Sequence, residues 1–310
     1  LFSDQIVLKE CKRLKKKKDI SIMMDLKKDI FDKKKDVMET IKKYKINVIT
    51  EMKQLKTKSN ICFFNYQCAK VNSYVHNNMI KRDNTNVIVH HNTEYYKGLE
   101  LICKKHHKAS KCRLFVNYAY EITKISNKYF TINEPVESVS MTLPISFLTS
   151  NFKLPYANTN HSVQGLTIEE DFTIFDMNTP YINRNWIWTA LTRTDDLKKI
   201  TIFEHDEATI NRLTASKMEQ YFKLKIQNYI VQDKKAGRAI DGENYVSTEW
   251  VRQCFFHQNK ECCICKTPLE FEIKDGSVSS NLTVDRQDNS VCHTVQNCKL
   301  SCVKCNTSRR

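Results

Sequence analysis

The chain has 310 residues, with 50 Lys and Arg against 35 Asp and Glu, which gives a formal net charge of +15. A chain of this length and charge accommodates two or three domains and favours a polyanionic partner, usually nucleic acid. A solvated Lys-rich surface explains the charge equally well, so motifs must decide. No apolar run approaches the ~18 residues of a membrane span, and the first residues lack the plan of a signal peptide. These features exclude a membrane partner, and the start reads like the interior of a longer protein.

The thirteen cysteines are unevenly placed, with five in the first 250 residues and eight between Cys254 and Cys305. Scattered cysteines without a secretion signal indicate reduced, buried thiols. We therefore expect an intracellular, reducing compartment, either the cytoplasm or the nucleus, or a viral factory if the source is a large DNA virus.

The first half of the chain has an α/β pattern. Apolar residues within residues 1–58 recur at spacings near three and four among lysines, which predicts helices. The lysines at 15–18 are read as a solvated face or, alternatively, as a contact to a DNA backbone. Ile61 to Phe64 form a short apolar run that ends at Asn65 and leads into a helix-like stretch. A buried strand followed by a helix predicts a parallel sheet.

Between Tyr95 and Asn133, β-branched and aromatic residues alternate with polar ones, which predicts short strands. These strands are expected to form either a small inserted β-barrel or an antiparallel extension of the sheet. Apolar strands follow and lead into the stretch from Pro155 to Phe203.

That stretch carries two polar signatures, AxTxHxxQGxT at Ala157 to Thr167 and WTALTR at Trp188 to Arg193. The first supplies hydroxyls for phosphate oxygens, a ring nitrogen, an amide that both donates and accepts, and a glycine that permits close backbone approach. These residues are Thr159, His161, Gln164, Gly165 and Thr167. In the second signature, a helix is expected to carry Arg193 outward before a strand at Lys199 to Phe203, where its planar fork suits phosphate oxygens.

In this order, the two signatures resemble the last two motifs of superfamily 1 DNA helicases of the RecD/TraA type. The resemblance implies ATP-driven translocation on single-stranded DNA in the 5′-to-3′ direction, with Arg193 as an arginine finger and Gln164 between nucleotide and DNA. It also implies that Arg13 touches a nucleotide phosphate and that residues 95–140 form an SH3-like barrel. Asn65 matches an Asn that follows a strand at the same point in the family, where it belongs to the DNA- or nucleotide-binding residues. The chain departs from the family at Ser162, where a Lys is common.

The ATP-binding half of such a motor is missing from this sequence. None of the five glycines precedes Lys-Ser or Lys-Thr, so a GxxxxGK loop followed by Ser or Thr is impossible. We expect ATP and Mg²⁺ to act only with a complete motor, whose first domain lies in cis or in trans.

Two Cys-x-x-Cys pairs, Cys262 with Cys265 and Cys302 with Cys305, predict a structural Zn²⁺ site. Cys263 is an alternative to Cys262. Cys254, Cys292 and Cys298 are interpreted as buried thiols.

The segment from Leu282 onward resembles the ββα-metal fold of HNH and recombination endonuclease VII-like nucleases. The resemblance places Asp285, His293, Asn297 and Asn306 in the nuclease frame and implies a Mg²⁺-type ion, with Asp288 as a further candidate. The residue after Asp285 is Arg286, which cannot accept a proton. The fold is expected to carry over, whereas cleavage and a non-catalytic DNA-binding knob both stay open.

The predicted fold class is α/β. Its parts are a RecA-like second motor domain at residues 1–94 and 141–205, the SH3-like β insertion at 95–140, a helical linker at 206–250 and a treble-clef or ββα-metal zinc module at 251–310. The leading hypothesis is the C-terminal part of an ATP-dependent DNA helicase. The alternatives are an endonuclease directed to DNA by the helicase-like region, and a DNA-binding protein without catalysis.

Overall fold

The computed structural model describes residues 17–80, 87–108, 113–133 and 140–308. The chain forms two compact units. The first contains Leu1–Asn178 and Arg184–Glu204, and the second Thr179–Asn183 and His205–Arg310. Arg13 lies outside the described residues. The finer division into motor domain, insertion, linker and zinc module stays a prediction.

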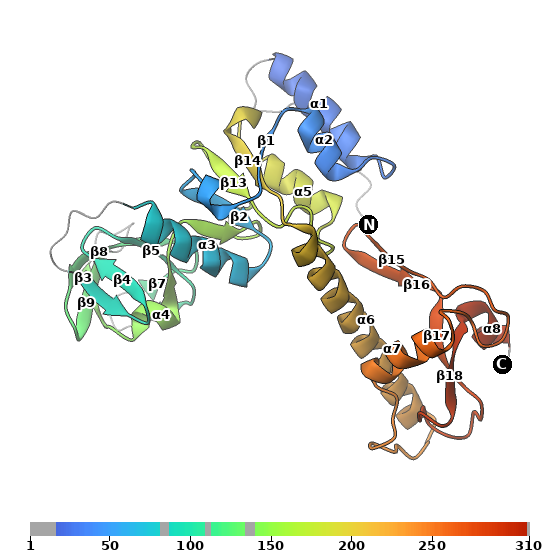
Figure 1. The fold of residues 1–310 in the computed structure, drawn as a ribbon. Coiled ribbons are helices and arrows are strands. Elements are labelled where there is room, and N and C mark those ends of the chain that lie inside the picture. Colours follow the sequence, from blue (N-terminus) through green and yellow to red (C-terminus); the bar gives the residue numbers. More distant parts are fainter. Residues whose placement is uncertain (1–16, 81–86, 109–112, 134–139, 309–310) are drawn as a thin grey trace, which may run out of the picture. The chain divides into compact units, whose positions relative to one another are not determined.

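The first unit contains a five-stranded sheet in which every pair of neighbours is parallel (Figure 1). Its order is β1 (Asn47–Ile49), β14 (Ile200–Phe203), β13 (Phe172–Ile174), β2 (Ser59–Cys62) and β12 (Ala157–Thr159). Ile61, Ile174 and Ile202 are fully buried, as expected for strands covered on both faces. The predicted parallel sheet with helices is therefore confirmed.

Six described helical segments accompany this sheet. They are α1 (Lys17–Phe31), α2 (Val37–Lys43), the 3₁₀ turns η1 (Met52–Gln54) and η2 (Leu197–Lys199), α3 (Asn65–Asn78) and α5 (Arg184–Leu191), with α3 packed on β2 and β12. Within the predicted helical stretch 1–58, the described residues form α1 and α2, whereas Asn47–Ile49 form the strand β1 instead of helix. Val71 and Val75 of α3 share a buried core with Phe175 and Phe203.

The order of the strands creates a topological switch point between β2 and β13. The chain leaves β2 through α3 toward β12, whereas it leaves β13 through α5 toward β14. In open parallel sheets, ligands bind at the carboxyl ends of strands at such a point. This edge is therefore where the chemistry of the first unit should be sought.

The predicted strands between residues 95 and 133 are present in a second, antiparallel sheet. Its order is β10 (Ser140–Pro144), β9 (Tyr129–Asn133), β8 (Ala119–Ile125), β5 (Glu100–Cys103) and β11 (Phe152–Lys153). Two hairpins accompany it, β3 (Val87–His90) with β4 (Thr93–Tyr96), and β6 (His107–Lys108) with β7 (Arg113–Leu114). Alternate residues such as Tyr120 and Ile122 are fully buried. A short helix, α4 (Phe147–Asn151), interrupts the stretch that was predicted as strands. That residues 95–140 form an SH3-like barrel stays a prediction.

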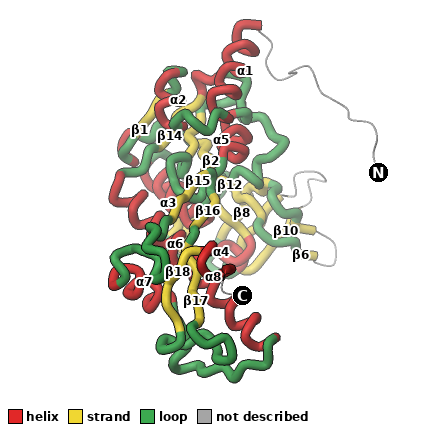
Figure 2. Tube along the Cα trace, turned by 90° about the vertical axis from the view of Figure 1, so that its right-hand side faces the viewer, coloured by secondary structure: helices red, strands yellow, loops and turns green. Residues whose placement is uncertain are grey.

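The second unit begins with α6 (Glu207–Lys235), a 29-residue helix that Asp206 caps by accepting a bond from the Thr209 amide. The remaining elements are α7 (Thr248–His257), β15 (Phe271–Lys274), β16 (Ser277–Ser280), β17 (Leu282–Arg286), β18 (Cys298–Cys302) and α8 (Val303–Ser308). Strands β17 and β18 pair antiparallel and lie side by side in Figure 2.

Helix α6 belongs to the core of this second unit. Phe222, Ile226 and Tyr229 pack against a buried cluster that includes Leu282 and Leu300. Residues 207–235 of the predicted linker are helical, whereas residues 236–247 are not, and α6 supplies part of the core of the second unit. Among the described helices, none is long and apolar enough to cross a membrane.

Candidate functional sites

The motif loop, residues 160–168, joins β12 to β13 at the carboxyl edge of the parallel sheet. Asn160 anchors its start, because its amide N–H donates to the Cys62 carbonyl (3.2 Å) and its side chain donates to the Trp186 carbonyl (3.1 Å). Gly165 has a φ of +91°, a conformation that side chains with a Cβ rarely adopt. The loop is thus pinned at its base and turns back through a glycine.

The polar residues predicted in the first signature lie together on this loop. His161, Gln164 and Thr167 are exposed, and Thr159 is half-buried at the end of β12. The Thr159 hydroxyl bonds the Ser162 hydroxyl at 3.2 Å. Exposed donors and acceptors on a fixed loop can reach a ligand without first giving up internal partners.

Arg193 is buried rather than directed outward, so that expectation is wrong. Its side chain is 7% exposed and follows the end of α5. Its Nε donates to the Thr189 carbonyl (2.8 Å), and its Nη1 donates to two carbonyls of the motif loop, Val163 (3.4 Å) and Leu166 (3.3 Å). The backbone of Arg193 also accepts from the Ile168 amide at 2.6 Å.

The reason for this inward position is the loop itself. Its turns leave carbonyl oxygens facing the protein, and buried carbonyls require donors. A guanidinium offers several donors in one plane, so one side chain serves two turns. Arg193 therefore binds the two signatures into a single structural unit.

Sequence reasoning missed Asp176, a buried carboxylate at the switch point. It lies two residues after the end of β13, has a φ of +67° and is fully buried. Its Oδ2 accepts from the amides of Phe63 (2.9 Å) and Phe64 (3.3 Å), immediately before α3. A negative charge is favourable at a helix N-terminus. An acidic residue at the end of a buried strand, in FTIFD, was the available signal.

The start of α3 also presents aromatic rings. Asn65 is exposed in the first turn, and Phe64 stacks on Tyr66 with centroids 4.9 Å apart. Tyr66 is 54% exposed, and exposed rings of this kind can stack on nucleic-acid bases.

In the second unit, the four predicted cysteines converge. The Sγ atoms of Cys262, Cys265, Cys302 and Cys305 lie within 4.8 Å of one another. Backbone amides donate to two of the sulfurs, from Cys302 to Cys262 (3.2 Å) and from Cys305 to Cys302 (3.4 Å). A hydrogen bond with the Thr267 hydroxyl lowers the pKa of Cys265 to about 6. Four sulfurs so arranged fit a tetrahedral Zn²⁺.

Cys262, rather than its alternative Cys263, belongs to the group of close sulfurs. Cys263 stands outside the cluster, and its amide donates to the Leu300 carbonyl at 3.0 Å. Cys292 and Cys298 are buried as predicted, whereas Cys254 is half-buried.

The nuclease-like frame has the expected order of strand, strand and helix in β17, β18 and α8. Asp285 is buried on β17, and the Asn306 amide of α8 donates to the Thr283 hydroxyl at 3.1 Å. The Asn297 side chain donates to the Asp288 carbonyl and accepts from its amide, both at 2.9 Å. Asn297 therefore holds the loop between the two strands, and exposed Asp288 caps Ser290 within it.

His293 is held by a residue that sequence reasoning missed, the fully buried Asp233 of α6. Asp233 accepts from the His293 amide (2.9 Å) and binds its Nδ1 (2.7 Å). It also accepts from the side chains of Tyr245 (2.8 Å), Arg238 (3.2 Å) and Arg286 (3.1 Å). Burial alone would raise the pKa of Asp233, but these donors lower it overall.

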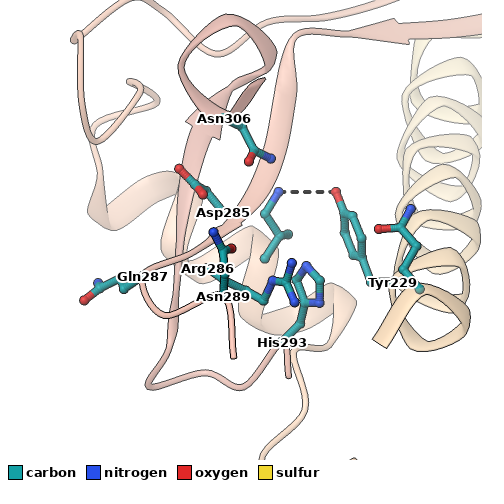
Figure 3. A pocket seen from close by; sticks show the side chains of 9 residues that line it. Tyr229, Asp285, Arg286, Gln287, Asn289, His293 and Asn306 are labelled. Atoms are coloured by element: carbon teal, nitrogen blue, oxygen red, sulfur yellow. Dashed lines mark hydrogen bonds between the residues drawn. The ribbon is translucent and has the colours of Figure 1, made fainter. Parts of the chain in front are cut away.

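A polar pocket of about 230 Å³ lies at β17 (Figure 3). Figure 3 shows Tyr229 reaching toward β17, where its hydroxyl accepts from the Val284 amide (3.3 Å), with Asn306 entering from α8. The pocket is lined by Tyr229, Gln232, Val284, Asp285, Arg286, Gln287, Asn289, His293 and Asn306. Three of the four nuclease-frame residues thus share one pocket, and Asn297 stays outside its lining.

Comparisons with known proteins give a limited result. No protein-family model matches the chain, and no curated protein matches it. Among solved structures, it is similar to two Pif1 helicases coordinating at forked double-stranded DNA, with 14% identity, a TM-score of 0.41, and coverage of 68% of this chain and 54% of that one.

Two other Pif1 structures are similar at the same level. Bacteroides Pif1 with ADP-AlF3 and single-stranded DNA shares 12% identity, with a TM-score of 0.42 and coverage of 68% of this chain and 56% of that one. Candida albicans Pif1 shares 12% identity, with a TM-score of 0.38 and coverage of 63% and 55%. The chain spans about half the length of these proteins. Likeness at this level concerns the fold and carries no statement about activity.

Proposed function

We propose that the first unit is the second motor domain of a superfamily 1 DNA helicase, which senses a nucleotide and grips single-stranded DNA. The observation that carries this proposal is the bonding of Arg193 to the Val163 and Leu166 carbonyls. It joins the two signatures at the carboxyl edge of a parallel sheet, where such folds bind ligands. ATP as the fuel and the 5′-to-3′ direction follow from the family resemblance.

The geometry suggests how the two tasks are coupled. A phosphate oxygen is a stronger acceptor for a guanidinium than a neutral carbonyl is. A nucleotide brought to this edge therefore competes with the motif loop for Arg193. Because His161 and Gln164 lie on that loop, their position changes with the occupancy of Arg193.

The residues of this chain do not fit a bound triphosphate on their own. The sequence contains no glycine followed by Lys-Ser or Lys-Thr, so it has no phosphate loop to cradle the β- and γ-phosphates. The proposed partner is a motor domain that carries this loop, in the same polypeptide or in another one. The reduced cysteine cluster supports a reducing, intracellular setting.

Binding of fluorescent single-stranded DNA tests the grip. The double variant His161→Ala, Gln164→Ala should bind about fivefold or more weakly, because two side-chain contacts are lost. Glu169→Gln, an exposed change just past the loop, is the matched control and should bind like the wild type. Equal affinity of the double variant and the wild type would remove the motif loop from DNA binding.

A second candidate function is metal-dependent cleavage of DNA by the second unit, and the shared pocket of Asp285, His293 and Asn306 favours it. Mg²⁺ is held by one or two carboxylates together with waters and substrate phosphates. Among the described residues, the cysteine cluster is the sole group of three or more close His, Cys, Asp or Glu side chains. Asp285 and Asn306 would hold the ion, which would stabilise charge on the phosphate.

Plasmid nicking in Mg²⁺ or Mn²⁺ tests this candidate. Asp285→Ala and Asn306→Ala should abolish nicking, whereas Glu272→Ala on the exposed face of β15 should not. If the wild type nicks no faster than Asp285→Ala in either metal, the second unit is a zinc-stabilised DNA-binding module without catalysis.

A further inference from the structure

We propose that Asp233 is the positioning residue for His293 and makes the Nε2 of that ring the proton acceptor of the pocket at β17. The inference rests on the cleavage function put forward above for the second unit. Helix α6, which lies outside the ββα segment, thereby gains a role. His293 would be the base of a site in which Asp285 is followed by Arg286, a side chain that cannot accept a proton.

The contacts of Asp233 fix the tautomer of His293. Oδ2 accepts from the His293 amide and from the Tyr245 hydroxyl, and it lies 2.7 Å from Nδ1. An ionised carboxylate only accepts hydrogen bonds, so Nδ1 must carry a proton. The neutral ring then has its lone pair on Nε2.

The surroundings of the ring keep it neutral and in place. It stacks on Tyr229 with centroids 4.5 Å apart and an interplanar angle of 18°. Burial lowers the pKa of His293, and the bond to Asp233 offsets only part of this effect. Arg238 and Arg286, both bound to Asp233, add positive charge nearby and oppose protonation.

Nε2 is the nitrogen left for a ligand. Within the part of the chain that the structure describes, it makes no hydrogen bond, and the ring lines the pocket together with Asp285 and Asn306. The same carboxylate that orients His293 also binds Arg286 through Oδ1. Arg286, which follows Asp285 in the strand and cannot act as a base itself, therefore helps to hold the ionised Asp233. Asp233 in turn positions His293 as the base.

The proposed step is the attack of water on a phosphodiester. A water oxygen forms a bond to phosphorus while Nε2 takes one of its protons. The phosphorus–oxygen ester bond breaks, and the leaving oxygen takes a proton from solvent. Asp233 stays ionised and stabilises the imidazolium that forms, as an orienting carboxylate does beside a catalytic histidine.

Ring-nitrogen NMR of the full, zinc-loaded chain tests the assignment, with His293→Gln used to identify the signals. The wild type should show a protonated Nδ1 and an unprotonated Nε2 at about pH 7.5, above the ordinary range of histidine. In Asp233→Asn the amide can donate to Nδ1, so the tautomer should invert. A wild-type ring with its proton on Nε2, or an unchanged tautomer in Asp233→Asn, overturns the proposal.

Activity supplies the second readout. Asp233→Asn should nick DNA about 100-fold or more slowly, the range expected for a lost general base. Glu272→Ala, an exposed change on β15 outside the pocket lining, is the control and should nick DNA at the wild-type rate. Zinc content and thermal melting check the folding of each variant. If Asp233→Asn fails to fold, the tautomer of His293 in the wild type decides whether the proposal holds.

Failure of the parent function gives a different pattern. A wild type that nicks no DNA in either metal removes cleavage and the base role of Nε2 together. If the wild type nicks DNA and Asp233→Asn nicks it equally fast, only the positioning role of Asp233 is removed.

Discussion

The motif loop and the Asp233 cluster use buried charge in opposite ways. In the first unit, a buried cation, Arg193, binds carbonyls of the loop that carries the exposed candidate residues. In the second unit, a buried anion, Asp233, gathers donors from several segments around one histidine. The first arrangement can be undone by a competing phosphate, whereas the second is complete within its own unit. Under the proposed functions, the first unit would need a partner site, whereas the second would supply its own.

The cysteine cluster should give the largest effect. Removal of Zn²⁺, or the change Cys262→Ser, should unfold the second unit, because a structural zinc contributes on the order of 10 kcal/mol to folding. The first unit should keep the melting temperature that it has in the wild type, since it contains none of the four ligands. Metal analysis and calorimetry measure both effects.

Cys263→Ser is the matched control for this experiment. Cys263 neighbours the ligand but lies outside the cluster, so this variant should keep a zinc content close to that of the wild type. Equal zinc loss from the two serine variants would contradict the assignment of Cys262.

Arg193→Ala should weaken the first unit by about 2–3 kcal/mol, because it leaves buried carbonyls without their charged donor. The second unit should keep its melting temperature. Thr167→Ala, an exposed change on the same loop, should alter the free energy of unfolding by less than about 0.5 kcal/mol. Denaturant unfolding of the three proteins makes the comparison. Equal stability of Arg193→Ala and Thr167→Ala would show that the arginine does not hold the loop.

Asp176 tests the switch point through two substitutions that differ in backbone tolerance. Asp176→Ala should cost about 1–2 kcal/mol, since it removes the acceptor of two helix-start amides and places a Cβ-bearing residue without a polar side chain at positive φ. Asp176→Asn keeps an acceptor and tolerates that conformation, so it should cost about 1 kcal/mol or less. The order of the two unfolding free energies is the measurement, and a reversed order would contradict the capping role.

The smallest effect expected is the contribution of His293 to the pH dependence of stability in the second unit. The pKa of His293 is lowered from 6.5 in the folded state, so the unfolded chain takes up the proton first and stability falls as the pH drops through that value. The lowered pKa of Asp233 acts in the same direction at pH values below 3.8. The free energies of unfolding of the wild type and of His293→Gln, measured across this pH range, isolate the contribution of His293, since both proteins carry the same four cysteines. Identical pH profiles would contradict it.

Much of the fold was predictable from local patterns. The two Cys-x-x-Cys spacings predicted the convergence of four cysteines, and the apolar run before Asn65 predicted a strand followed by a helix, present as β2 and α3. Local patterns failed where the partners are distant. The inward position of Arg193 depends on carbonyls 27 and 30 residues earlier in the chain. Asp233 was missed because its partners come from separate segments and reach up to 60 residues along the sequence.

DNA-stimulated ATP hydrolysis tests the central claim most directly. The chain alone should hydrolyse no ATP, because it has no phosphate loop. Joined to a motor domain that carries one, it should show hydrolysis that rises with single-stranded DNA and falls about 1,000-fold in Arg193→Ala, the scale of a lost arginine finger. Hydrolysis by the chain alone, or a joined motor that is indifferent to Arg193, would contradict the account.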